Sequence, residues 1–223
     1  MFISAETLDG ALLDLYPKLL ARTNNTVSAT RGAFVEEIGA LIEITNSRAR
    51  LSRSETRGKL FSSLGELVWY LSGSNKLDAI EPYVPQYKEE AEDGIVFGGY
   101  GPRIFGQVDQ IQSVIELLKE RPTSRRAVIQ IFDKTDIATA TPRKEIPCTI
   151  ALQFFVRDDK LAAIATMRSN DAYWGLPHDV FCFTMLDLTN IARATLRFSQ
   201  RSKISGVNEL NSNRAPLRWD KTA

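Results

Sequence analysis

Residues 148–168, CTIALQFFVRDDKLAAIATMR, decide the fold. The stretches 148–157 and 160–168 are rich in apolar and β-branched residues, as strands are, and Asp158 and Asp159 stand between them. Two strand-like runs joined by a two-residue turn predict an antiparallel hairpin. The strand-like run AVIQIF at 127–132 precedes the hairpin and is expected to belong to the same sheet.

Helices are expected both before and after these strands in the sequence. Residues 57–72 carry apolar residues at helical spacing, which we expect to face the core: Leu60, Phe61, Leu64, Leu67, Val68 and Leu71. A second helix is predicted over 107–120, and a third opens at Pro177 and loses its apolar period after Arg193. The pattern predicts an α+β fold in which a mixed or antiparallel β-sheet is covered by helices.

Composition excludes several classes of protein. The chain has 223 residues, 28 Lys and Arg against 27 Asp and Glu, and a formal net charge of +1. It has no overall basic field to attract nucleic acid, and no apolar run approaches the length of a membrane span. The acidic N-terminal stretch is unlike a signal peptide, so we expect a cytoplasmic protein. Two cysteines and one histidine do not have the spacing of metal ligands, so no metal site is predicted.

The organisation predicted for the chain is one catalytic domain and a tail. Residues 1–196 contain the elements described above. Residues 197–223 are polar, rich in Asn, Ser and Arg, and have no clear period, so we expect a poorly ordered tail. The single domain is long enough to bury one substantial core.

Four ordered motifs resemble one known family. They are GELVWYLSG at 65–73, GGYGPRIF at 98–105, SRRAVIQIF with IPCTIALQF between 124 and 154, and MRSNDAYWGLPHDVF at 167–181. All resemble segments of thymidylate synthases and of the related cytidylate hydroxymethylases, and the likeness spans roughly residues 30–193. The resemblance implies a thymidylate synthase-like fold and a folate-dependent transferase that uses 5,10-methylenetetrahydrofolate as cosubstrate.

The resemblance assigns three catalytic residues. Cys148 is the nucleophile that attacks the pyrimidine ring, Glu66 is the carboxylate that orders water and moves protons, and Tyr100 belongs to a hydrogen-bond network near C5 of the base. This chemistry suits a thiolate, because its addition to C6 activates C5 toward a one-carbon donor. Each residue also has an alternative without a catalytic role. Cys148 would be a small buried core residue, Glu66 an exposed helical glutamate and Tyr100 an aromatic ring packed in a loop.

The phosphate of a nucleoside monophosphate suits the planar fork of arginine. The resemblance assigns it to Arg168 and Ser169 of one subunit, to Arg125 and Arg126 from the partner, and to Arg31. A site built from two chains implies a homodimer. A solvated surface charge is the alternative for each arginine taken alone.

The resemblance also supplies candidates for the base and the folate. Asp179, Gln153 and Gly175 are expected at the base, and Asp171 and Trp69 at the folate. Thymidylate synthases carry asparagine where this chain has Asp179, whereas cytidylate hydroxymethylases carry aspartate. An aspartate can accept from the 4-amino group of cytosine and, with a shared proton, engage N3. Alternatively, Asp179 interacts only with the N-terminal dipole of its helix.

The family's later histidine and tyrosine, which hold the sugar, have no counterpart here, because no tyrosine follows Tyr173 and the single histidine is His178. The C-terminus is therefore interpreted as truncated or altered relative to the family. Three functions remain open. Hydroxymethylation of a cytidylate is favoured by Asp179, methylation of deoxyuridylate to thymidylate is the second, and an inactive nucleotide-binding member of the family is the third.

Overall fold

The computed structural model describes residues 1–21, 26–29, 32–52, 56–137, 143–186 and 191. Two expectations lie outside the described residues: the phosphate contact of Arg31 and the polar tail 197–223. The remaining predictions can be compared with the structure.

The central sheet has the order β5-β6-β7 and is antiparallel, with β5 Val128–Gln130, β6 Thr149–Arg157 and β7 Lys160–Met167. The hairpin between β6 and β7 closes with Arg157 opposite Lys160. Asp158 and Asp159 have φ values of 50° and 57°, which is the backbone of a type I′ turn and matches the right-handed twist of the strands. The hairpin predicted from the sequence is confirmed.

Two smaller sheets lie in the N-terminal part of the chain. β1 (Phe2–Ala5) pairs in parallel with β4 (Leu41–Ile44), and β2 (Thr26–Ala29) pairs antiparallel with β3 (Gly32–Val35). Helix α1 (Leu8–Leu20) packs on β1 and β4, and this unit contacts Ala172 and Leu176 near the start of the last helix. Parallel and antiparallel pairs together with helices confirm the α+β class.

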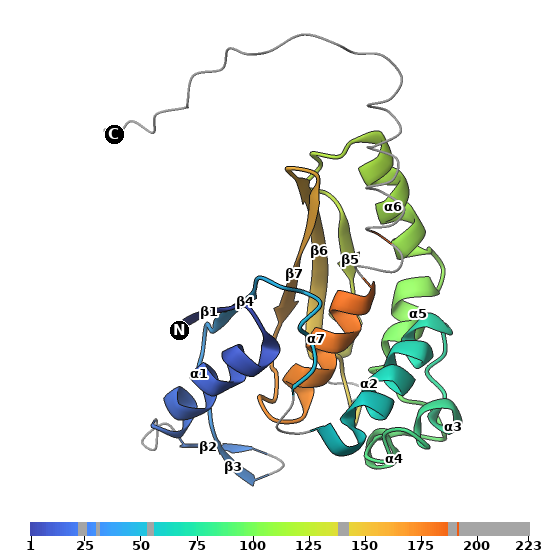
Figure 1. The fold of residues 1–223 in the computed structure, drawn as a ribbon. Coiled ribbons are helices and arrows are strands. Elements are labelled where there is room, and N and C mark those ends of the chain that lie inside the picture. Colours follow the sequence, from blue (N-terminus) through green and yellow to red (C-terminus); the bar gives the residue numbers. More distant parts are fainter. Residues whose placement is uncertain (22–25, 30–31, 53–55, 138–142, 187–190, 192–223) are drawn as a thin grey trace.

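The other helices are gathered toward one face of the central sheet (Figure 1). They are α2 (Thr56–Leu71), α3 (Leu77–Ile80), α4 (Tyr87–Glu90), α5 (Tyr100–Phe105), α6 (Gln110–Glu120) and α7 (Gly175–Leu186), and a 3-10 helix η1 covers Lys134–Ile137. In α6 the Asp109 side chain accepts from the Gln112 amide and caps the helix. The sequence predicted that the last helix starts at Pro177, and α7 begins two residues earlier, at Gly175.

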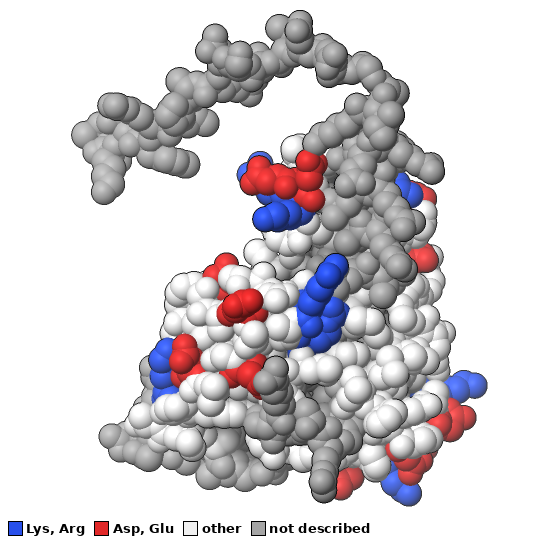
Figure 2. All heavy atoms as spheres, in the orientation of Figure 1, with Lys and Arg blue, Asp and Glu red and all other residues white. Residues whose placement is uncertain are grey.

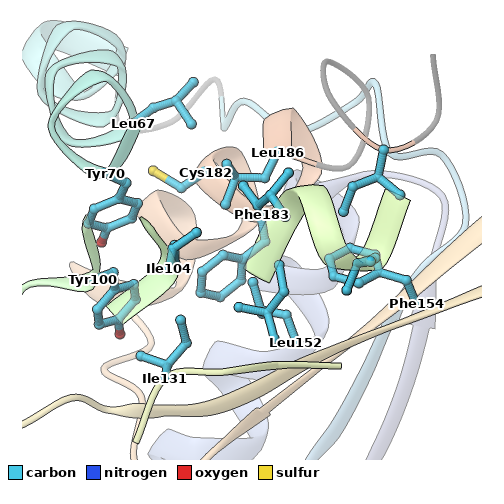
Figure 3. Packing of buried hydrophobic residues seen from close by; sticks show 14 of the residues in the cluster. Leu67, Tyr70, Tyr100, Ile104, Ile131, Leu152, Phe154, Cys182, Phe183 and Leu186 are labelled. Carbon is cyan, nitrogen blue, oxygen red and sulfur yellow. The ribbon is translucent and has the colours of Figure 1, made fainter. Parts of the chain in front are cut away.

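The main core joins α2, α5, α6 and α7 to one face of the sheet (Figure 3). Leu152 and Phe154 of β6 point into it, and Phe183 and Leu186 of α7 pack against them. Cys182 is 0% exposed and lies between α7 and α2. This packing fixes α2 and α7 side by side, which positions the site described below.

The buried face of α2 differs from the face that the sequence predicted. Ser63, Glu66, Leu67 and Tyr70 are buried, whereas most of the apolar residues expected in the core are exposed by these fractions: Leu60 41%, Phe61 72%, Leu64 43%, Val68 57% and Leu71 40%. The reason is that α2 is apolar on both sides, so periodicity alone could not identify its buried face. We call Leu60, Phe61, Leu64, Val68 and Leu71 the outer face of α2.

Charges on the visible surface are scattered. In Figure 2 the basic and acidic side chains of the described residues form small groups separated by uncharged surface. No helix among the described residues is long and apolar enough to cross a membrane. An anionic ligand on this face would therefore be held by local groups.

Candidate active site

Cys148 lies at the start of β6, between buried Pro147 and Thr149. Arg168 follows β7 directly. Because β6 and β7 are paired, its guanidinium lies beside the residues that precede β6. Its Nε donates to the Pro147 carbonyl at 2.9 Å and its Nη2 to the Ile146 carbonyl at 3.1 Å. The same Nη2 lies 3.8 Å from the Cys148 sulfur. Arg168 therefore both holds the loop before β6 and places a cation beside the thiol.

The electrostatic surroundings of Cys148 are mixed. Partial burial raises the pKa of its thiol, Arg168 lowers it, and the charges of Glu145 and Asp179 raise it further. The net pKa lies above the ordinary value. A cation beside a thiol favours the thiolate, and of the three arginines Arg125, Arg126 and Arg168 it is Arg168 that reaches the sulfur within this chain.

Tyr100 stands at the first position of α5, next to the start of β6. Its hydroxyl donates to Thr149 Oγ1 at 2.9 Å and accepts from the Thr149 amide at 3.3 Å. Arg103 anchors α5, because its two terminal nitrogens pair with the Asp136 carboxylate at 2.6 and 2.7 Å. Burial and the nearby charge of Asp179 raise the pKa of Tyr100 well above its usual value. Tyr100 is therefore a fixed, neutral phenol within electrostatic reach of Cys148 and Asp179.

Glu66 is buried on the inner side of α2 and accepts three hydrogen bonds. Its Oε1 accepts from Tyr70 at 2.8 Å and from Tyr87 at 2.5 Å, and its Oε2 lies 3.1 Å from His178 Nδ1. Burial raises the pKa of Glu66, but the hydrogen bond and charge of His178, together with the two tyrosine hydroxyls, lower it by more. The result is a pKa below the usual value, so Glu66 is an ionised buried carboxylate.

Asp179 lies one residue after His178 in the first half of α7. Burial raises its pKa well above the ordinary value, the charge of Glu66 raises it further, and a hydrogen bond from Asn170 opposes both. Gly175 lies on the same side: a Cβ there would come 2.8 Å from Asn170 Oδ1 and 3.8 Å from Asp179 Oδ2. The absent side chain leaves space beside the Asp179 carboxyl.

The two folate candidates occupy very different places. Asp171 is exposed, and its Oδ1 accepts from the backbone amides of Tyr173 and Trp174, which fixes the turn before α7. Trp69 is only 2% exposed and packs against Tyr70 and Tyr87 with ring centroids 5.9 and 5.1 Å apart. Asp171 is accessible to a ligand, whereas Trp69 belongs to the core.

Three other candidates from the sequence lie away from Cys148. The Ala127 carbonyl bonds the Phe154 amide, so Arg125 and Arg126 flank the far end of β6. Phe154 is six residues after Cys148, and at about 3.3 Å per residue this places the two arginines ~20 Å along the strand from Cys148. Gln153 donates to the Arg125 carbonyl at 2.8 Å, on the exposed side of the sheet. Ser169, in contrast, follows Arg168 directly and is exposed near the thiol.

Several residues of the site were missed by the sequence analysis. Tyr70 follows Glu66 by four residues on a helix, so helical spacing could have identified that pair. His178 and Tyr87 come from α7 and α4, and nothing local in the sequence predicts their contact with Glu66. Among the described residues, no group of three or more His, Cys, Asp or Glu is arranged to hold a metal ion.

Comparison with known proteins adds relatives to this geometry. The family model described as thymidylate synthase matches residues 52–199. Thymidylate synthase of Francisella philomiragia is 30% identical over 141 residues, covering 56% of this chain and 52% of that protein. Deoxyuridylate hydroxymethyltransferase of Delftia phage PhiW-14 is 32% identical over 144 residues, covering 59% and 40%.

A solved structure supports the fold independently. The thermostable thymidylate synthase A from Bacillus subtilis aligns with a TM-score of 0.51 and 28% identity, covering 60% of this chain and 51% of that one. The chain spans about half the length of the relatives that it matches. The matched region contains Glu66, Tyr100, Cys148, Arg168 and Asp179. On this family match and this fold, the chain belongs to the thymidylate synthase family.

Proposed function

We propose that this chain transfers a one-carbon unit from 5,10-methylenetetrahydrofolate to C5 of a pyrimidine nucleoside 5′-monophosphate. The observation that carries the proposal is the convergence of four elements on the Cys148 thiol. The start of β6 brings the thiol, the end of β7 brings Arg168, α5 brings Tyr100 and α7 brings Asp179. The names of the relatives, which include thymidylate synthases and deoxyuridylate hydroxymethyltransferases, support the same reaction class.

In this reaction the Cys148 thiolate adds to C6 of the base. A carbon–sulfur bond forms, and the electron pair of the C5–C6 double bond moves toward the substituent at C4, which makes C5 nucleophilic. The raised pKa of the free thiol means that the nucleophile is mostly protonated before substrate binds. The loss of the thiol proton is therefore a step that this site must support. Arg168 is the described cation that lies beside the sulfur.

Glu66 and Tyr100 supply the proton transfers. Glu66 is ionised and can accept a proton through ordered water, which is the work of a general base. Tyr100 remains protonated at neutral pH, and its Thr149 partner fixes the orientation of its hydroxyl. When C5 has bonded to the one-carbon unit, the C5 hydrogen leaves as a proton and the bond between that carbon and the folate nitrogen breaks, which leaves an exocyclic methylene group on the base. Addition of hydride or water to this methylene group and expulsion of Cys148 then restore the ring.

The folate supplies the one-carbon unit, and in a methylation also the hydride that completes the methyl group. Residues on the exposed turn before α7 fit a pterin and its attached ring. Asp171 is a hydrogen-bond acceptor at the surface, and the rings of Tyr173 and Trp174 beside it are 52% and 55% exposed. Flat aromatic surface next to a carboxylate suits a flat heterocycle that carries N–H donors.

The preferred base is proposed to be cytosine, which is supported by the position of Asp179 near Cys148 and Tyr100. Burial and the charge of Glu66 favour the protonated carboxyl of Asp179. A protonated carboxyl can accept from the 4-amino group of cytosine and donate to N3. The product would then be the 5-hydroxymethyl derivative of a cytidylate, formed when water adds to the exocyclic methylene group.

A second candidate is a deoxyuridylate substrate, and the same carboxyl favours it. With its two oxygens exchanged, a protonated carboxyl can accept from uracil N3–H and donate to O4. Two of the relatives, from Delftia phage PhiW-14 and Bacillus phage SP01, are deoxyuridylate hydroxymethyltransferases. An ionised Asp179 would lack the donor that O4 requires.

The proposed assembly is a homodimer in which Arg125 and Arg126 serve the neighbouring site. Both side chains are exposed, and within the described part of the chain neither guanidinium forms an ion pair or hydrogen bond. They lie too far along β6 to reach a phosphate held by Arg168 of the same chain. The outward side of the sheet carries apolar residues such as Val128 and Ile164, which are 38% and 50% exposed, as an interface between copies requires.

Tritium release from 5-tritiated deoxyuridylate and cytidylate, with and without methylenetetrahydrofolate, tests the proposal. We expect release from the parental chain and none from Cys148→Ala, while the variant still binds nucleotide in calorimetry because only the nucleophile is removed. Binding without release by the parental chain would instead establish the inactive nucleotide-binding alternative. Release by Cys148→Ala at the parental rate would refute the mechanism.

A further inference from the structure

His178 connects two residues of α2 across the interface between α2 and α7. Its Nδ1 lies 3.1 Å from Glu66 Oε2, and its Nε2 lies 3.0 Å from Ser62 Oγ. Ser62 and Glu66 are four residues apart and so lie on the same side of the helix. The side chains of His178 and Glu66 are 13% and 7% exposed, so water has little access to the pair.

The hydrogen bonds determine where the ring proton lies. The Glu66 carboxylate only accepts, so Nδ1 of His178 must carry the proton of that contact. Ser62 can then donate to Nε2 of the neutral ring or accept from Nε2 of the charged ring, because a hydroxyl does both. One orientation of the ring therefore satisfies both Glu66 and Ser62.

Glu66 is one of two neighbouring carboxyl groups in the site, the other being Asp179. The groups that face Glu66 are Tyr70 on its own helix, Tyr87 on α4, and His178, Asp179 and Cys182 on α7. His178, Tyr70 and Tyr87 all donate to Glu66, whereas within the described part of the chain the hydrogen bond to the Asp179 carboxyl comes from Asn170. Neighbouring carboxyl groups whose surroundings differ in this way take different protonation states.

We propose that His178 is the positioning residue that keeps Glu66 ionised and thereby leaves the proton on Asp179. Its role in base recognition rests on the proposed function. With Glu66 charged beside it, Asp179 is kept neutral and can present an O–H donor to the pyrimidine. Without His178, Glu66 would be buried with only two tyrosine donors, and the two carboxyl groups would compete more evenly for one proton.

The contact itself can be tested without any activity. His178 is the only histidine of the chain, so ¹⁵N-histidine labelling of the full chain gives one pair of ring-nitrogen resonances. We expect Nδ1 to be protonated and both ring shifts to change in Glu66→Gln. Glu89→Gln, at an exposed glutamate of α4, is the matched control and should change neither. Ring shifts that are the same in Glu66→Gln and in the parental chain would overturn the proposal.

The effect on chemistry is tested with His178→Phe and His178→Asn. The phenylalanine fills the space without a donor, and the asparagine keeps an N–H near the position of Nδ1. We expect tritium release by His178→Phe to fall by about tenfold or more at pH 6 and to move back toward the parental rate as the pH is raised, because a higher pH favours the ionised Glu66 without the help of His178. Nucleotide affinity of His178→Phe should also fall at pH 6, because Asp179 then donates its O–H to the base in only part of the molecules, and His178→Asn should recover part of the rate at pH 6.

If His178 had only a structural role, His178→Phe would lose the same fraction of tritium release at every pH. That outcome would overturn the proposal. Near-UV circular dichroism identifies a variant that has lost its packing. If His178→Phe does not fold, Ser62→Ala decides: alanine favours the helix, the substitution removes the hydroxyl that contacts Nε2, and it should move the Nε2 shift and slow release at pH 6. If the parental chain releases no tritium, the proposed function fails, and the ring resonances still decide whether His178 binds Glu66.

Discussion

At the scale of single residues, Cys148 lies between charges of opposite sign. Arg168 approaches the sulfur from β7, and Glu145 precedes it by three residues in the same loop. The thiolate fraction of Cys148 at neutral pH depends on the balance between these two side chains. Because alkylating reagents react with the thiolate, the balance can be measured directly.

Alkylation of Cys148 by iodoacetamide at pH 7 should be several-fold faster in Glu145→Gln than in the parental chain. The substitution removes a negative charge that raises the pKa of the thiol. Arg168→Gln should change the rate in the opposite direction. Cys182 is 0% exposed, so mass spectrometry should find the label on Cys148 alone. Equal rates in all three proteins would show that neither charge acts on the sulfur.

Asp179 gives a prediction about stability and pH. Its pKa is raised in the folded chain, so between the unfolded value of about 3.9 and the folded value the native state binds more protons than the unfolded state. Stability contributed by the protonated carboxyl is therefore present at low pH and decreases as pH rises through this window. Asp179→Asn, which cannot ionise, should melt at a higher temperature than the parental chain at pH 7.

The same variant separates the stability effect from base choice. At pH 4 the melting temperatures of parental and Asp179→Asn chains should converge, because both carry a neutral side chain there. In tritium release, Asp179→Asn should shift preference from cytidylate toward uridylate, since an amide suits uracil N3–H and O4. A stabilised variant with an unchanged preference would leave Asp179 as a buried acid without a role in recognition.

The sequence predicted part of this site and missed another part for an identifiable reason. Cys148, Tyr100, Arg168 and Asp179 were named from motifs, and the structure brings them together; their roles stay predictions. From the sequence, His178 was considered only as a possible metal ligand, which its spacing from the cysteines excluded. Its contact with Glu66 joins residues 112 positions apart, and such long-range pairings are set by the packing of α2 on α7, which no local pattern in one sequence encodes.

At the scale of elements, α2 has two apolar sides, of which one is buried and the other is exposed. Leu67 and Tyr70 are 3% exposed and belong to the core, while the adjacent Val68 is 57% exposed on the outer face of α2. Leu67→Ala should lower the free energy of unfolding by about 2–5 kcal/mol. Val68→Ala, the matched control, should change it by no more than about 0.5 kcal/mol. Urea titrations of both variants measure this, and equal losses would mean that the outer face is covered in solution.

The bounds of helices and strands were predicted most closely where the sequence carries one clear pattern. The hairpin of β6 and β7 has a two-residue polar turn between two apolar runs, and α6 has one apolar stripe and an aspartate cap, so both were located closely. β5 is shorter than the run AVIQIF suggested, because Ile131 and Phe132 bend away to reach the same Ile150 carbonyl. In α2, burial of Glu66 depends on partners from α4 and α7, which a hydrophobic period does not show.

At the scale of the whole molecule, the position of Arg125 and Arg126 decides whether one chain can complete a site. We expect Cys148→Ala and Arg126→Ala each to be inactive or nearly so in tritium release. Mixed in equal amounts and allowed to exchange subunits, they should recover about a quarter of parental activity, because half of the dimers then have one intact site of two. A mixture as inactive as its components would place Arg126 in the site of its own chain, and an Arg126→Ala variant with parental activity would place Arg126 outside any site.

The outer face of α2 and Glu66 belong to one helix of 16 residues, and a helix transmits displacement along and across its axis as a nearly rigid rod. Whatever binds the outer face and shifts α2 must also shift Glu66 relative to α7. The two events are then thermodynamically linked, and the linkage is reciprocal. A nucleotide that draws Glu66 toward the base changes the affinity of the outer face by the same factor by which occupancy of that face changes the affinity for nucleotide.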